Sequence, residues 1–125
     1  MSTMQVTNSG LDLFRDSLSG ADSSLIKYVA IGTGNSTPTA SQTKLDAEVY
    51  RNAIASYTDG ASVGEILVNG IIPAGAAVGT AIAEVAFFGG NAASATANSG
   101  VMVARGLYSH TKGTETLQLV GDIVF

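Results

Sequence analysis

The amino end of the chain has a helical pattern of apolar positions. Three apolar residues recur at the i, i+3, i+7 spacing of one helix face: Leu11, Phe14 and Leu18. Asn8 or Ser9 can cap the amino end of such a helix, and Gly20 stands where a C′ glycine ends one. The pattern therefore predicts one short helix over residues 7–20.

The rest of the chain consists of short apolar stretches separated by turn residues. The stretch 45–57 fits a helical face and an alternating pattern about equally, and we favour a strand from Tyr50 onward. The other predicted strands are 25–31, 63–72, 78–88, 101–109 and 116–125. Turn signals separate several of them: Asp59-Gly60, Pro73-Ala-Gly75 and Lys112-Gly113.

This order of elements predicts a mainly β fold, an antiparallel β-sandwich or barrel of about six strands with one short N-terminal helix. The length of 125 residues fits one domain. We expect a single domain over 1–125, with the helix at 7–20 and a β-domain at 25–125.

The composition limits the kinds of partner that we expect this chain to bind. Charged residues make up 13% of the chain, against about 25% in a typical soluble domain, which predicts a surface covered by copies of the chain or by other proteins. The six basic residues are scattered and the net charge is −4, so we expect no nucleic-acid partner. We also expect no membrane partner, because the most apolar window, 79–90, is short and contains Glu84. The amino end resembles no signal peptide, which predicts synthesis and solubility in a cytoplasm.

Metal and cofactor sites are not expected. The chain has no cysteine and one histidine, and Asp12, Asp16 and Asp22 lack calcium-loop spacing. The strand–glycine sequence Gly32-Thr-Gly34 suggests a phosphate loop, but no lysine follows before Lys44 and Pro38 interrupts the loop. We interpret it as a glycine corner at which a strand leaves the sheet.

A distant functional candidate is a small hydrolase that uses Ser62 and His110. Residues 60–64 match G-x-S-x-G, yet the serine opens a predicted strand instead of a strand-to-helix turn. A carbohydrate-binding module is also a weak candidate. Such a module needs exposed aromatic side chains, and the chain has no tryptophan and only four tyrosines. We therefore expect no enzymatic activity and no small-molecule substrate.

Glu84 is a carboxylate in an otherwise apolar predicted strand. If the strand is regular, it shares a face with three residues: Ile82, Ala86 and Phe88. A buried carboxylate needs a partner, and Arg51 or Arg105 could provide one. We expect a structural role for Glu84. The following small-residue segment, 91–99, lacks any evident anchor and is predicted to be mobile or to contact a partner.

Four segments carry a family resemblance. They are Ile26-Lys-Tyr-Val-Ala-Ile-Gly-Thr-Gly34, Ser41-Gln-Thr-Lys-Leu45, Glu48-Val-Tyr-Arg51 and Ile82-Ala-Glu-Val-Ala-Phe-Phe88. In this order they resemble the N-terminal domain of bacteriophage tail-fibre (tail-collar fibre) proteins, over about residues 7–109. The chain departs from the family's last motif at Ala86, where the family tends to have glycine.

The resemblance implies a non-enzymatic virion structural protein, made in the bacterial host cytoplasm. It implies a homotrimer that binds other phage virion proteins. Because family fibres continue into long shafts and this sequence ends at Phe125, we expect a tail or baseplate component or a fibre-attachment module. The alternative is a trimeric capsid decoration protein that stabilises the head. The expected structural or interface residues are Gly32, Gly34, Pro38, Gln42, Thr43, Leu45, Glu48, Arg51, Glu84 and Arg105.

Overall fold

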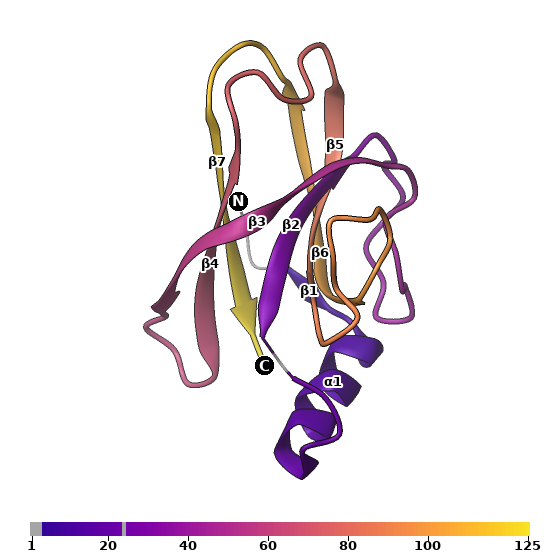
Figure 1. Cartoon of the computed structure of the whole chain (residues 1–125), viewed down its shortest axis with the longest axis vertical. Helices are drawn as coiled ribbons and strands as arrows, with labels where there is room; N and C mark the ends of the chain where they lie inside the picture. Colours follow the sequence, from indigo (N-terminus) through magenta and orange to yellow (C-terminus); the bar gives the residue numbers. More distant parts are fainter. Residues whose placement is uncertain (1–3, 24) are drawn as a thin grey trace.

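The computed structural model describes residues 4–23 and 25–125, and it confirms the mainly β fold. The elements are β1 (Gln5–Val6), α1 (Asn8–Ser19), β2 (Ile26–Gly32), β3 (Glu48–Asp59), β4 (Glu65–Ile72), β5 (Ala81–Gly89), β6 (Val101–Thr111) and β7 (Leu117–Val124). The strands form a curled antiparallel sheet in the order β1-β6-β5-β2-β3-β4-β7 (Figure 1). The six predicted strands are present. The two-residue strand β1 was not predicted, because no apolar run marks it in the sequence.

The sheet curls until its two ends nearly meet. Strand β3 continues across the bend, where its register with β4 shifts between Ile54 and Ser56. At the opposite side, the Met4 N–H donates to the Asp122 carbonyl over 2.9 Å and joins β1 to β7. The strands therefore enclose a core on their inner side. The core includes Val29 and Phe87, which are fully buried.

Two glycines let large side chains pack directly against the backbone of the opposite wall of this core. A Cβ placed on Gly121 would overlap the ring of Phe87, and one on Gly70 would lie 2.7 Å from Cβ of Val29. Large residues on β5 and β2 thus face bare backbone on β7 and β4, as close packing across a narrow interior requires.

Helix α1 is present as predicted, but a different residue caps its amino end. The side chain of Thr7, not Asn8 or Ser9, accepts the capping bond from the Gly10 N–H, over 3.0 Å. Gly20 ends the helix in the left-handed conformation (φ 80°), as predicted. Leu13 is the buried apolar side chain of α1, and Gly10 approaches the β6 backbone closely. The face formed by Leu11, Phe14 and Leu18 points outward instead, with each side chain at least 45% exposed.

The outer side of the sheet is also covered. A second buried cluster lies there, made of Ala30, Leu45, Ala86, Phe88 and Met102. The prediction that Ile82 shares this face with Glu84 is wrong, because a register shift between these two residues places Ile82 in the inner core. The loops 33–47 and 90–100 cover the outer side (Figure 1). We call these loops, together with the strand residues that hold them, the outer layer. The strand residues are Glu48, Arg51, Glu84 and Arg105.

Candidate functional site

The first loop of the outer layer is held by the carboxylate of Glu84, which is completely buried. Its Oε2 accepts the N–H groups of Gly34 and Ala47, each over 2.9 Å. Its Oε1 accepts the Asp46 N–H at 2.9 Å and the Arg105 Nε–H at 3.0 Å. Both oxygens are therefore fully engaged. Glu84 thus acts as a buried hydrogen-bond acceptor around which the loop folds.

Arg105 provides the buried positive charge and extends the network through the same loop. The sequence left Arg51 and Arg105 open as partners of Glu84, and the structure selects Arg105. Its Nη1 donates to the Ser36 carbonyl at 2.8 Å and to Gln42 Oε1 at 3.2 Å. Its Nη2 donates to Asp46 Oδ2 at 3.2 Å. All three guanidinium nitrogens thus bind within this chain, as a buried arginine requires.

Arg51 pairs with Glu48 and holds the second loop. Nε and Nη2 each donate to one Glu48 oxygen over 2.8 Å, which is a bidentate ion pair. Nη1 donates to the carbonyls of Ser94 and Ser99, both at 3.1 Å, while Glu48 Oε1 accepts the Asn98 N–H at 3.2 Å. The segment 91–99 is therefore anchored in the structure, and the prediction that it lacks an anchor is wrong. Sequence reasoning missed this because the anchor lies more than forty residues away.

The same arginine is packed against aromatic rings. Its guanidinium carbon lies 4.5 Å from the centroid of Phe88 and 5.7 Å from that of Tyr28. A cation over an aromatic face gains additional attraction. Arg51 thus connects the second loop, the outer cluster and strand β3.

The glycine corner is explained by the buried carboxylate. A Cβ on Gly32 would lie 2.5 Å from both Glu84 Oε2 and the Ala47 carbonyl oxygen, and one on Gly34 would lie 2.8 Å from Glu84 Oε2. The backbone can approach an anion here only without side chains. The resemblance to a phosphate loop has a physical basis, but the anion belongs to the protein.

The remaining predicted residues occupy different places in the first loop. Gln42 accepts the Thr39 N–H at 3.0 Å in addition to its bond with Arg105, and Leu45 is buried in the outer cluster. Pro38 is half-buried and Thr43 is exposed. The structure thus brings together eight of the ten predicted residues in two adjoining networks. The expectation that the loop 35–43 contacts a partner, with Pro38 and Gln42 important for assembly, stays a prediction.

Asp46 is a member of the network that sequence reasoning missed. Hydrogen bonds from Ser36, together with the nearby Arg105 charge, hold the pKa of its carboxyl group below the usual value. Its position directly after Leu45, at the end of the Gln42–Leu45 motif, was the available signal. An isolated loop aspartate is normally a solvated residue, so this signal alone was too weak to interpret.

Ser62 and His110 lie at opposite ends of the sheet. Ser62 belongs to the turn before Glu65, which pairs with Val124, whereas His110 pairs with Ile82 near the other end. His110 Nε2 lies 2.8 Å from Glu115 Oε1, and this bond lowers the pKa of Glu115 to about 2. The serine–histidine arrangement considered from the sequence is therefore not formed.

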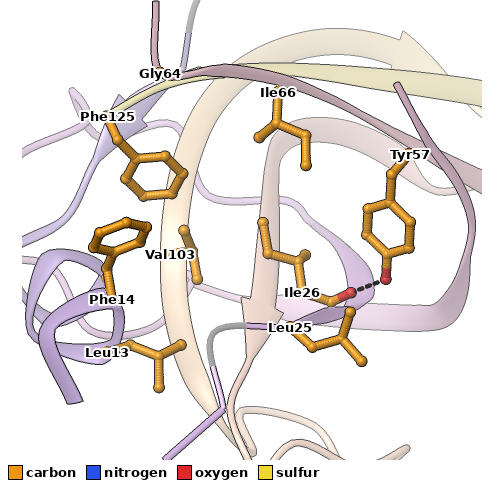
Figure 2. A pocket seen from close by; sticks show the side chains of 10 residues that line it. Leu13, Phe14, Leu25, Ile26, Tyr57, Gly64, Ile66, Val103 and Phe125 are labelled. Atoms are coloured by element: carbon orange, nitrogen blue, oxygen red, sulfur yellow. Dashed lines mark hydrogen bonds between the residues drawn. The ribbon is translucent and has the colours of Figure 1, made fainter. Parts of the chain in front are cut away.

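An apolar groove of about 390 Å³ opens between α1 and the neighbouring end of the sheet (Figure 2). Its lining is Gly10, Leu13, Phe14, Leu25, Ile26, Tyr57, Gly64, Ile66, Val103 and Phe125. The rings of Phe14 and Phe125 stack with centroids 5.6 Å apart. Tyr57 donates its hydroxyl hydrogen to the Ile26 carbonyl, and partial burial raises its pKa. Sequence reasoning missed this groove because an amphipathic helix normally directs its apolar face inward.

Within residues 4–23 and 25–125, no group of three or more acidic, histidine or cysteine residues is arranged to hold a metal ion. No helix in the same residues is long and apolar enough to cross a membrane. Comparison of the chain with known protein families, curated proteins and solved structures found no match.

Proposed function

We propose that this protein is a non-enzymatic phage virion structural protein, a tail or baseplate component or fibre-attachment module that acts through oligomer assembly. In this proposal the outer layer is a rigid scaffold held by the chain's own charges. The partners are further copies of the chain and other virion proteins.

The observation that carries the proposal is the convergence of the four segments that resemble tail-fibre proteins. Gly34 binds Glu84, and Gln42 binds the Arg105 that pairs with the same carboxylate. The pair of Glu48 and Arg51 completes the group, with Arg51 packed on the strand that carries Glu84. Segments scattered over more than fifty residues thus form one physical unit, which supports a shared structural motif over a chance coincidence of short patterns.

The proposal is tested by deleting the gene from the phage genome that carries it and examining the particles. A tail or baseplate role predicts intact, filled heads, particles that lack a tail feature, and loss of infectivity. Complementation with the wild-type gene serves as the control. Unstable heads with complete tails would instead support the decoration protein. Purified particles that never contain the protein would overturn both virion roles.

A further inference from the structure

The end of the molecule around α1 exposes a large share of its apolar side chains. Seven large apolar residues of the described chain gather there with at least 42% of each exposed: Leu11, Phe14, Leu18, Leu25, Tyr57, Val63 and Phe125. Four of them line the groove in Figure 2. Leu11 and Leu18 continue the patch along the helix, and Val63 precedes the groove residue Gly64. We call this surface the apolar end.

The size of the apolar end argues for a protein partner. With roughly 150–250 Å² for each whole aromatic residue, the exposed fractions of Phe14, Tyr57 and Phe125 leave on the order of 250 Å² uncovered. The four aliphatic side chains add to this area. Single soluble chains rarely expose a contiguous apolar patch beyond a few hundred Å². The patch has the size expected for the centre of an interface that takes about 800 Å² from each partner.

The apolar end also carries a projection beside its groove. Val63 is 98% exposed at the tip of the turn between β3 and β4, so it makes almost no contact within its own chain. The groove lining contains no charged residue. An apolar projection and an uncharged groove on one molecule are complementary surfaces, and a contact between two copies covers both at once.

Resting on the proposed function, we propose that the groove receives the Val63 turn of a second copy of this chain. The contact joins two different surfaces, so each copy offers one groove and one projection to its neighbours. Such a contact closes into a ring when the rotation between copies permits it. No charged side chain lines the groove, so none repels the incoming turn.

The test uses sedimentation velocity across the micromolar range on variants of the full chain. Val63→Asp removes the projection and Leu25→Glu blocks the groove, and we expect each to be monomeric where the wild type is oligomeric. Val78→Asp is the matched control, because Val78 is 53% exposed and lies far from the groove residues in the turn after β4. We expect this variant to assemble as the wild type does.

Mixing the two monomeric variants distinguishes this contact from a general loss of solubility. Val63→Asp retains a groove and Leu25→Glu retains a projection, so the mixture should form a one-to-one pair and nothing larger. Circular dichroism checks folding, and Val63→Ser replaces Val63→Asp if the latter unfolds. A monomeric wild type, or full assembly of folded Val63 variants, would overturn the proposed contact. Protein found on virions but monomeric in solution would overturn this inference alone, whereas self-assembly with absence from virions would overturn the proposed function alone.

Discussion

The outer layer and the apolar end of this protein differ in whether their side chains find partners within the chain. In the outer layer, buried charges are paired inside the chain, and every guanidinium nitrogen of Arg51 and Arg105 donates a hydrogen bond within the chain. At the apolar end, large side chains such as Leu18 and Val63 remain 76% and 98% exposed. The first region is complete by itself, whereas the second leaves apolar surface that a partner could cover.

This difference shows that the residues of a recognisable sequence motif need not be the residues that bind another protein. Glycine, glutamate and arginine positions attract notice in the sequence because their chemistry is unusual in a β-rich chain. The structure uses them to build the fold, with Glu84 and Gly34 as the clearest example. The surface with the strongest physical reason to bind another protein consists of ordinary leucine, valine and aromatic residues, which no short motif marks.

The largest expected effect comes from breaking the outer layer at Glu84. Glu84→Ala leaves the Arg105 guanidinium buried without its carboxylate and removes the acceptor from three backbone N–H groups. We expect a loss of about 3–5 kcal/mol in the free energy of unfolding, measured by urea denaturation. Asp12→Ala is the control, because it breaks an exposed ion pair with Arg15 that contributes about 0–1 kcal/mol. Equal losses in the two variants would show that the buried network does not stabilise the fold.

Part of the outer layer could be predicted from the sequence, because some of its paired residues lie close together along the chain. Glu48 and Arg51 are three residues apart, and a carboxylate inside an apolar strand requires a cation nearby. The choice of Arg105 depended on the pairing of β5 with β6, which the pattern alone does not give. The direction of α1 could not be predicted either, because Gly10 permits a close approach to β6 that places Leu13 inward and turns the more regular apolar face outward.

A smaller loss is expected from Gly32→Ala. The new methyl group would lie 2.5 Å from the Ala47 carbonyl oxygen and from Glu84 Oε2, so backbone must move and the carboxylate site must open. We expect about 1–3 kcal/mol of destabilisation in urea. Gly75→Ala is the matched control, since a methyl group there meets nothing within 4 Å and should leave stability nearly unchanged. Equal stability of both variants would contradict the account of the glycine corner.

Arg51→Lys tests the second loop of the outer layer. Lysine keeps the charge but cannot reproduce the bidentate pair with Glu48 and the bonds to the Ser94 and Ser99 carbonyls. We expect amide hydrogen exchange at Asn98 to become about tenfold faster, which corresponds to about 1.4 kcal/mol of local stability. Exchange in the first loop, over 33–47, should be unchanged and serves as the internal control. Unchanged exchange at Asn98 would mean that Arg51 does not anchor this loop.

The smallest expected effect is a pH dependence far from both regions. The bond with His110 lowers the pKa of Glu115 from 4.5 to about 2, so the folded state favours the ionised carboxylate. Its stabilising effect is complete above pH 4.5 and is lost as the pH falls through about 2. Thermal unfolding of the wild type and Glu115→Gln should therefore differ near neutral pH and converge toward pH 2. A constant difference over this range would contradict the assigned bond.

The central claim is that the outer layer maintains the fold while the apolar end mediates assembly. Comparing Arg105→Met with Val63→Asp tests it most directly, by measuring each for thermal unfolding at high dilution and for sedimentation at higher concentration below its unfolding temperature. We predict that Arg105→Met lowers the unfolding temperature but still assembles, whereas Val63→Asp keeps the wild-type unfolding temperature at dilution and stays monomeric. A folded Arg105→Met protein that cannot assemble, or a Val63→Asp protein that assembles normally, would contradict this division.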